Sequence, residues 1–260
     1  MNDLNNSTQR FSDRVDDYVK YRPTYPVEII EFLKSELNFN SSKVVVDVGS
    51  GTGISSELFL SNGNKVYGVE PNDGMRCAAE NNLKRYSNFT SIKGTSSLTN
   101  LPDKVADIII AAQAFHWFEP ESTKLEFQRI LKDNGYVILI WNDRRTTGTP
   151  FLEQYEALIN EFGTDYKKVK HKNIEGSRIE TFLGPYKLFS LYNSQEFDFH
   201  GLLGRLTSSS YVPNKNHPNF DEMCSALRSL FEIHQLNGKI KIEYDTQLFY
   251  SQFNFPRENK

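Results

Sequence analysis

The feature that most constrains the fold is a short apolar run that ends in three closely spaced glycines. Residues 43–48 read Lys-Val-Val-Val-Asp-Val, and Gly-Ser-Gly-Thr-Gly follows at 49–53 before a helical pattern over 54–61. A β-branched run of this kind is typical of a strand buried on both faces of a parallel sheet. Glycines at such a turn let the backbone bend sharply and approach a ligand closely. The pattern therefore predicts a ligand-binding turn whose helix amides face an acceptor-rich or anionic group.

Strand and helix patterns then alternate along the chain. Further strands are expected at 65–70, 89–93, 106–112 and 136–141, and helices at 26–37, 73–86 and 120–131. This alternation predicts a parallel sheet with helices on both faces, joined by right-handed crossovers. Ligands bind such sheets at the carboxyl ends of the strands, near the point where the strand order reverses.

The pattern loosens after residue 142. We expect a helix over 150–162, strand segments at 187–192 and 196–199, an amphipathic helix over 220–236 and a final strand or hairpin over 239–253. The chain is thus interpreted as a single domain, 1–260. Its parts are an N-terminal helical lid (1–38), a ligand-binding core (43–142), an inserted cap (143–218) and a C-terminal helix with the final strands (219–260).

Composition excludes several classes of protein. The 260 residues carry 30 Lys+Arg against 33 Asp+Glu, a balance that argues against a protein that coats DNA or RNA. Two cysteines, Cys77 and Cys224, make no disulfide framework and no zinc spacing, so no metal is expected. No apolar run approaches the ~20 residues that span a bilayer, and residues 1–10 lack a secretory pattern. We expect a cytoplasmic enzyme or ligand-binding domain without a membrane partner.

The residue types around the glycines narrow the ligand. Glu70 ends the next strand, where a carboxylate accepts hydrogen bonds from both hydroxyls of a ribose. The dinucleotide fingerprint needs Gly or Ala at its sixth position, and Ile54 stands there. A nicotinamide or flavin ligand is therefore disfavoured but stays open. The phosphate-binding pattern G-x-x-x-x-G-K-[ST] is absent, and a turn without any ligand remains the plainest alternative.

Several segments resemble the class I S-adenosylmethionine-dependent methyltransferases. The matching segments are 45–53 (motif I), 69–75 (the second motif), 111–117 (the fourth) and 135–142 (the fifth strand after its turn). The opening residues 11–26, with 209–213 and 244–248, are similar to one branch of that family. This branch includes small-molecule enzymes of the ubiquinone/menaquinone-biosynthesis and trans-aconitate types.

The resemblance implies a fold, a cofactor and a set of contacts. The fold is an α/β, Rossmann-like, seven-stranded and mostly parallel sheet with helices on both faces, and the cofactor is S-adenosyl-L-methionine. In this reading Glu70 holds the ribose, Pro71 and Met75 flank the adenine, and Arg22 suits the methionine carboxylate. The implied cofactor contacts are Tyr18, Tyr21, Arg22, Asp47, Gly49, Ser50, Gly51, Gly53, Glu70, Pro71, Met75, Thr95, Ser96 and Gln113.

This chain departs from the family pattern at two places. Ser50 stands where Cys or Ala is more usual, and the acidic residue often found near Thr95 and Ser96 is missing. The second departure leaves recognition of the adenine partly to backbone groups.

Acceptor and catalytic residues are expected after the fourth and fifth strands and in the cap. His116 is the candidate general base, with Trp117, Asn142, Arg144 and Tyr211 as candidate acceptor contacts. Arg144 and its neighbour Arg145 suit a carboxylate or a phosphate, although a solvated loop is an equal alternative. Tyr18, Tyr21 and Trp117 offer aromatic faces to a sulfonium cation, with packing against the sheet as the alternative.

We therefore predict an enzyme that moves a methyl group from S-adenosylmethionine to a small-molecule oxygen, nitrogen or carboxylate by in-line displacement. The alternatives are a nicotinamide-dependent oxidoreductase and a non-catalytic nucleoside-binding module. Methylation of a nucleic acid is disfavoured because the basic run 167–172 is short and [DNS]-P-P-[YF] is absent after the fourth strand. We expect a monomer or a homodimer.

Overall fold

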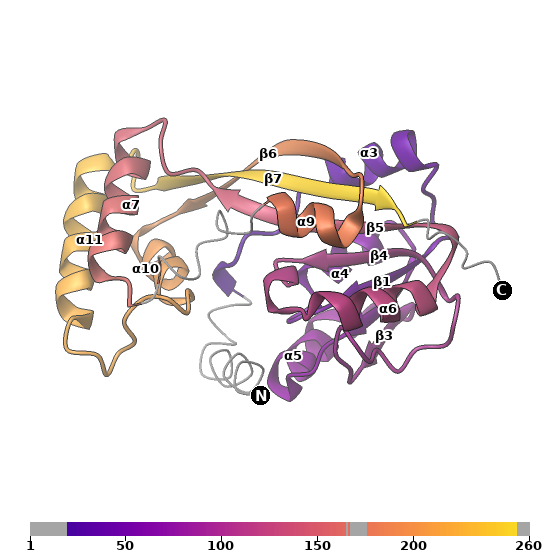
Figure 1. Ribbon diagram of the computed structural model, residues 1–260. Coiled ribbons are helices and arrows are strands. Elements are labelled where there is room, and N and C mark those ends of the chain that lie inside the picture. The colour runs from indigo at the N-terminus through magenta and orange to yellow at the C-terminus, as the bar shows by residue number, and fades with distance from the viewer. Residues whose placement is uncertain (1–19, 165, 167–175, 254–260) are drawn as a thin grey trace.

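The computed structural model describes residues 20–164, 166 and 176–253 (Figure 1). The helices are α3 (Glu28–Leu37), α4 (Ile54–Ser61), α5 (Asp73–Leu83), η1 (Phe115–Trp117), α6 (Pro120–Ile130), α7 (Pro150–Phe162), α9 (Gly176–Leu183), α10 (Phe199–Thr207) and α11 (Phe220–His234). The strands are β1 (Val44–Val48), β2 (Lys65–Val69), β3 (Phe89–Ile92), β4 (Ala106–Ala112), β5 (Leu131–Arg144), β6 (Lys187–Phe197) and β7 (Ile240–Gln252). Among these described residues, no helix is both long and apolar enough to cross a membrane.

The strands form a single seven-stranded sheet in the order β3-β2-β1-β4-β5-β7-β6. Strands β1 to β5 pair in parallel, whereas β7 runs antiparallel to both β5 and β6. The order reverses between β1 and β4, so the crevice expected for a ligand lies at their carboxyl ends. The α/β fold class with a mostly parallel seven-stranded sheet is confirmed.

Helices cover the sheet on both faces because the central strands alternate their buried side chains between two cores. Val45 and Ile108 belong to the core under α3, α4 and the end of α5. Val46 and Ile109 belong to the opposite core, under α6 and α9. Continuous apolar strands of this kind leave the polar chemistry to the loops at their ends.

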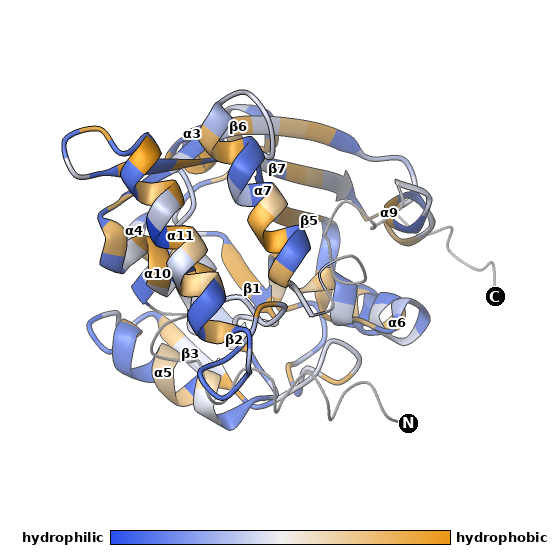
Figure 2. Cartoon of the chain, turned by 90° about the vertical axis from the view of Figure 1, so that its left-hand side faces the viewer, coloured by the Kyte–Doolittle hydropathy of each residue, from blue (hydrophilic) through white to orange (hydrophobic). Residues whose placement is uncertain are grey.

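A third core lies beyond the carboxyl end of β5, where α7, α10 and α11 pack together (Figures 1 and 2). Figure 2 shows hydrophobic and hydrophilic residues alternating along α7 and α11. The ends of β6 and β7 and the N-terminal Tyr21 join the same core. We call α7, α10 and α11 the cap.

The segment 143–218, expected as an inserted cap, contributes more than a cap. It supplies α7 and α10, but it also supplies β6, which pairs with β7 along its whole length. The two strand segments expected there form one continuous strand, because every residue from Lys187 to Phe197 has a partner on β7. Strand β5 likewise extends from Leu131 to Arg144, well beyond the expected 136–141.

Candidate functional site

The glycine turn after β1 has the backbone geometry that its sequence predicts. Gly49, Gly51 and Gly53 have φ angles of 71°, 55° and 86°, in the left-handed region that favours glycine. A Cβ at Gly49 would lie 2.6 Å from Ala114 Cβ, and one at Gly53 would lie 2.6 Å from Leu83 Cδ1. A Cβ at Gly51 would meet no atom within 4 Å. The outer glycines therefore permit close packing, and the middle one faces open space.

Two buried carboxylates, those of Asp47 and Glu70, hold this turn through hydrogen bonds. Asp47 accepts hydrogen bonds from Ser55 Oγ at 2.6 Å and Ser56 Oγ at 2.7 Å, in the first turn of α4. Burial raises the pKa of Asp47 to about 6, although the hydrogen bonds from both serines act to lower it. The resemblance implies a direct cofactor contact for Asp47, but its side chain lies under α4 and does not line the cavity described below.

Glu70 links the end of β2 to the glycine turn. Its Oε2 accepts from the Gly51 amide at 2.9 Å, and its Oε1 accepts from the Asn72 amide at 2.8 Å. Burial raises the pKa of Glu70, and these two amides partly offset that effect. Each carboxylate oxygen can accept more than one hydrogen bond, so Glu70 retains acceptor capacity for a diol such as ribose.

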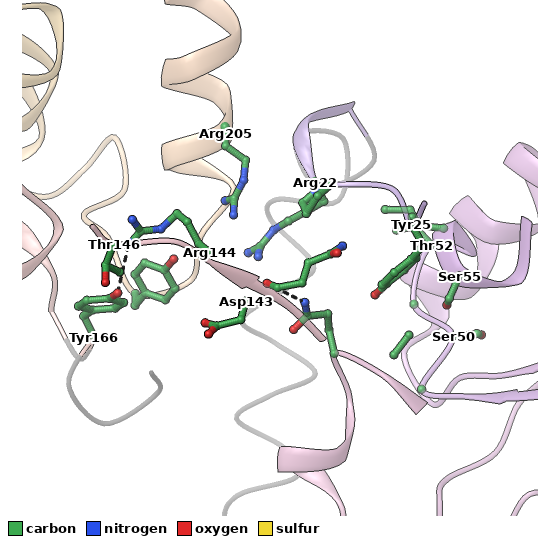
Figure 3. Close-up of a pocket in the computed structure, with 18 residues that line it drawn as sticks. Arg22, Tyr25, Ser50, Thr52, Ser55, Asp143, Arg144, Thr146, Tyr166 and Arg205 are labelled. Atoms are coloured by element: carbon green, nitrogen blue, oxygen red, sulfur yellow. Dashed lines mark hydrogen bonds between the residues drawn. The ribbon is translucent and has the colours of Figure 1, made fainter. Parts of the chain in front are cut away.

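A cavity runs from the glycine turn to the cap (Figure 3). It lies at the carboxyl ends of β1, β4 and β5, as the reversal in strand order requires. Its walls come from the turn, β4, β5, α10 and the segment before α3. The lining residues are Arg22, Pro23, Tyr25, Gly49, Ser50, Gly51, Thr52, Ile54, Ser55, Ala112, Gln113, Asn142, Asp143, Arg144, Thr146, Tyr166, Arg205 and Tyr211.

Gln113 stands at the reversal point, immediately after β4. Its φ of 56° is in the left-handed region, which is uncommon for a residue other than glycine and is enriched at functional sites. Its amide nitrogen Nε2 donates to the Asn142 carbonyl at 3.3 Å. Its Oε1 is buried without a hydrogen-bond partner among the described residues. Gln113 therefore presents a desolvated acceptor at the cavity wall.

Asn142 connects four parts of the chain next to this point. Its Oδ1 accepts from Thr246 Oγ1 at 2.5 Å and from Asn193 Nδ2 at 3.2 Å, and its Nδ2 donates to the Thr24 carbonyl at 3.2 Å. It thereby ties β5 to β7, to β6 and to the segment before α3. Asn142 lines the cavity, and its side chain is occupied by these structural contacts.

The far end of the cavity is positively charged. Arg22, Arg144 and Arg205 reach it from three different elements (Figure 3). Arg144 pairs with Glu156, and its Nη2 also donates to Tyr166 Oη at 3.1 Å. Arg22 Nη2 donates to the Ser208 carbonyl at 2.9 Å. Arg145, expected beside Arg144, pairs instead with Asp245 and lies outside the lining.

The residues expected near adenine lie on the β2 and β3 side of the turn. Pro71 is exposed, whereas Met75 is buried and its amide caps α5 by donating to Asn72 Oδ1 at 2.9 Å. Ser96 Oγ accepts from Thr123 Oγ1 at 2.8 Å, and Thr95 bridges to Leu98. None of these four residues lines the cavity, which covers the methionine side of the expected site.

Three residues expected to contact the ligands lie outside the cavity lining. His116 and Trp117 lie in η1 with their rings 4.7 Å apart, and neither lines the cavity. Tyr21 is buried in the cap core against Gly204 rather than in the cavity wall. Tyr18 lies outside the described residues. The aromatic wall of the cavity comes instead from Tyr25, Tyr166 and Tyr211.

Sequence patterns missed part of the lining. Tyr25 and Pro23 belong to the opening segment that resembles one methyltransferase branch, so that motif was the signal for them. Tyr166 and Arg205 stand where periodicity is weak, and only the folded cap brings them to the cavity. Among the described residues, no group of three or more His, Cys, Asp or Glu side chains is arranged to hold a metal ion.

Comparisons with known proteins agree with this architecture. A family model described as a methyltransferase domain matches residues 46–139. The chain is 28% identical to an uncharacterized methyltransferase-like protein of Schizosaccharomyces pombe, over 93% of this chain and 94% of that protein. It is 28% identical over 124 residues to a probable S-adenosylmethionine-dependent methyltransferase of Saccharomyces cerevisiae, covering 45% and 42% of the two chains.

Solved structures show the same fold. One is described as a candidate type II methyltransferase from Anaeromyxobacter dehalogenans, with a TM-score of 0.64 at 18% identity, over 90% of this chain and 98% of that one. Motif I lies at the carboxyl end of β1, Glu70 ends β2, and the family model matches the core that holds both. The methyltransferase domain at 46–139, the methyltransferase-named relatives and the fold together support a class I S-adenosylmethionine-dependent methyltransferase.

Proposed function

We propose that the chain transfers the methyl group of S-adenosylmethionine to a small-molecule oxygen, nitrogen or carboxylate by in-line displacement. The observation that carries this proposal is the cavity itself, which joins the glycine turn to a polar cap wall. The donor is bound at one end and the acceptor at the other, so the reacting groups meet between them. We further propose that the enzyme acts in the cytoplasm as a monomer or homodimer, without a nucleic-acid substrate.

The polar groups around the cavity fit the cofactor. The Glu70 carboxylate suits the ribose hydroxyls. The open space beside Gly51 leaves room for the sugar next to the glycine turn. The buried Gln113 Oε1 suits the ammonium group of the methionine part, and Arg22 suits its carboxylate. Pro71 and Met75 would flank the adenine, with Thr95 and Ser96 near its amino group. The glycine turn, the Gln113 acceptor and the Arg22 cation thus match the nucleoside, the ammonium group and the carboxylate of the cofactor in turn.

The protein's main task in this chemistry is alignment. When bound, S-adenosylmethionine supplies a methyl group already activated by its positively charged sulfur. The cavity walls orient the acceptor toward that group and exclude water, and such positioning contributes up to about 7–11 kcal/mol to catalysis. His116 lies outside the cavity lining, so we assign it no role in proton transfer. A carboxylate or an already deprotonated acceptor needs no base.

Calorimetric titration with S-adenosylmethionine tests the cofactor site. We expect S-adenosylmethionine to bind the wild-type chain. Its affinity for Glu70→Ala should be at least about 10-fold lower, because the two hydrogen bonds from the ribose hydroxyls to the carboxylate are lost. Gly51→Val should bind as weakly, because its side chain would enter the cavity. Glu57→Ala, on α4 but paired with Arg85 at the surface, is the matched control and should bind normally.

Equal binding by Glu70→Ala, Gly51→Val and the wild-type chain would contradict the assignment. Titration with NADH separates the oxidoreductase alternative, which predicts binding of NADH in place of S-adenosylmethionine. Mass spectrometry of a panel of small acceptors then separates catalysis from binding alone, because only catalysis adds a methyl group and releases S-adenosylhomocysteine.

A further inference from the structure

The strongest unexplained feature of the molecule is a buried arginine in the cap. The Arg205 side chain belongs to α10 and is only 6% exposed. Its Nε donates to Tyr244 Oη at 3.1 Å, and its Nη1 donates to Ser209 Oγ at 3.2 Å. Both partners are neutral hydroxyls. Within residues 20–164, 166 and 176–253, no carboxylate lies within ion-pair distance of this guanidinium.

A buried cation of this kind calls for a negative charge. The guanidinium of arginine stays protonated in proteins, so Arg205 cannot relieve its burial by losing a proton. Taking such a group out of water costs several kcal/mol unless a charged partner offsets the loss. The ring of Tyr244 contributes a weak cation–π contact, with its centroid 5.9 Å away. Among the described residues, these contacts satisfy part of the hydrogen-bonding capacity of Arg205 but supply no negative charge to pair with it.

Arg205 faces the cavity rather than a closed core. It lines the cavity together with Tyr211, which follows α10, and with Arg144 from β5. Figure 3 shows the guanidinium ends of Arg205 and Arg22 directed at the same space, whereas Arg144 points toward Tyr166. Arg144 is paired with Glu156, so of Arg144 and Arg205 it is Arg205 that lacks a carboxylate partner in the described part of the chain.

The electrostatics of Tyr211 report the same excess of positive charge. Burial acts to raise the pKa of this phenol, yet the charges of Arg205, Arg144 and Arg22 together hold its pKa below the usual value. Asp143 is the acidic side chain on the cavity wall, and it stands nearer the middle of the cavity in Figure 3. The cap end is thus a desolvated, positively charged recess.

We propose that the methyl acceptor carries an anionic group, a carboxylate or a phosphate, which Arg205 binds in this recess with help from Tyr211. This inference rests on the proposed function, because it assigns the glycine-turn end of the cavity to the cofactor. The anion is an anchor and not the atom that is methylated, since pairing with a guanidinium would weaken it as a nucleophile. The anchored acceptor presents its reacting oxygen or nitrogen toward the glycine turn. Acceptors without the anion would leave Arg205 unmatched and bind poorly.

Anion binding without turnover tests this proposal separately from the chemistry. The chain is saturated with S-adenosylhomocysteine, and inorganic phosphate or succinate is then titrated in by calorimetry at low chloride. We expect at least one of the two anions to bind, and the stronger of them identifies the class of anchor. Arg205→Gln keeps hydrogen-bond donors but loses the charge, so anion affinity should fall at least about 10-fold. Its affinity for S-adenosylhomocysteine should stay within about twofold.

Arg145→Gln is the matched control, because Arg145 pairs with Asp245 outside the cavity. It should bind both probes as the wild type does. Binding of neither anion to the wild-type chain, or equal anion binding by Arg205→Gln, would overturn the anchor. A chain that fails to bind S-adenosylhomocysteine at all would instead refute the proposed function.

A second measurement keeps the proposal testable if Arg205→Gln does not fold. In a crystal structure of the wild-type chain with S-adenosylhomocysteine and phosphate, we expect phosphate oxygens within hydrogen-bond distance of the Arg205 guanidinium. Phosphate found only at Arg22, or only on the outer surface, would contradict the assignment.

Discussion

Asp47 shows how a buried polar side chain can hold a turn through contacts that the sequence does not reveal. Its carboxylate is fully buried and accepts hydrogen bonds from two serine hydroxyls at the start of α4. The sequence placed this residue next to the glycines, but the family pattern suggested a contact with the ligand. Only the folded chain shows the carboxylate directed under the helix, because spacing along a strand does not reveal which neighbour a polar side chain meets.

The raised pKa of Asp47 predicts a particular pH dependence of stability. Its folded pKa of about 6 exceeds the value of about 3.9 expected in the unfolded chain, so the folded state holds the proton more tightly. This carboxyl therefore favours folding most below about pH 4, and its contribution falls by up to about 3 kcal/mol as pH rises to about 6.

Urea unfolding of the wild type and Asp47→Asn between pH 4 and pH 7 measures this effect. The asparagine carbonyl still accepts from the serines but does not titrate. The stability of the wild type relative to the variant should decrease across that window, because the other groups contribute equally to both chains. A difference that stays constant with pH would show that the Asp47 pKa is not raised.

A side chain at Gly49 should clash with Ala114, in addition to the cost of its backbone angle. Gly49 and Gly184 have φ angles of 71° and 72°, but a Cβ would meet Ala114 at 2.6 Å only at Gly49. Alanine in this region costs about 1–2 kcal/mol at either position. We expect Gly49→Ala to lower the free energy of unfolding by about 1–3 kcal/mol more than the control Gly184→Ala. Equal losses in chemical denaturation would exclude the close approach.

At the scale of elements, local patterns allowed prediction, whereas the pairing of strands far apart in sequence could not be predicted. Helix α4 and strand β4 have the boundaries expected from the sequence, because α4 lies between the glycine turn and the Asn62-Gly63 turn and β4 is a nearly continuous apolar run. Strand β6 was expected as two pieces, and its continuity comes from pairing with β7, which is far away in sequence. Helix α10 was not expected, although it carries Arg205 to the cavity.

The N-terminal cap of α10 is expected to contribute measurably to stability. Asp198 accepts a hydrogen bond from the Gly201 amide at 2.7 Å, whereas Asn219 makes no such side-chain bond at the start of α11. Asp198→Ala should therefore lower the free energy of unfolding by about 1 kcal/mol. The control Asn219→Ala should change it by less than about 0.5 kcal/mol. A comparable loss in both variants would mean that the Asp198 cap contributes nothing specific.

At the scale of the whole molecule, the N-terminal segment joins the sheet to the cap. Tyr21 packs against Gly204 of α10, while Arg22, Pro23 and Tyr25 line the cavity. The sequence predicted that this segment covers the ligand, because its motif resembles one methyltransferase branch. It did not predict that Tyr21 docks on the cap, since the docking surface forms only when α10 folds.

Gly204→Ala tests this coupling between the cap and the cofactor site. A Cβ at Gly204 would lie 2.2 Å from Tyr21 Cε2, so the segment must shift. We expect a loss of stability of about 1–3 kcal/mol and at least about fivefold weaker calorimetric binding of S-adenosylmethionine. Gly201→Ala is the control, because its Cβ would clash with Phe197 at 2.8 Å and not with the segment. It should lose stability but keep its affinity for the cofactor. Unchanged affinity in Gly204→Ala would contradict the coupling.

We infer that the carboxyl ends of β1, β2 and β4 hold S-adenosylmethionine. A crystal structure of the chain with S-adenosylhomocysteine would show whether they do. We expect the ribose hydroxyls on the Glu70 carboxylate, the ammonium group of the methionine part at Gln113 Oε1 and its carboxylate at Arg22. A cofactor bound elsewhere, or bound here with its ribose away from Glu70, would contradict this site.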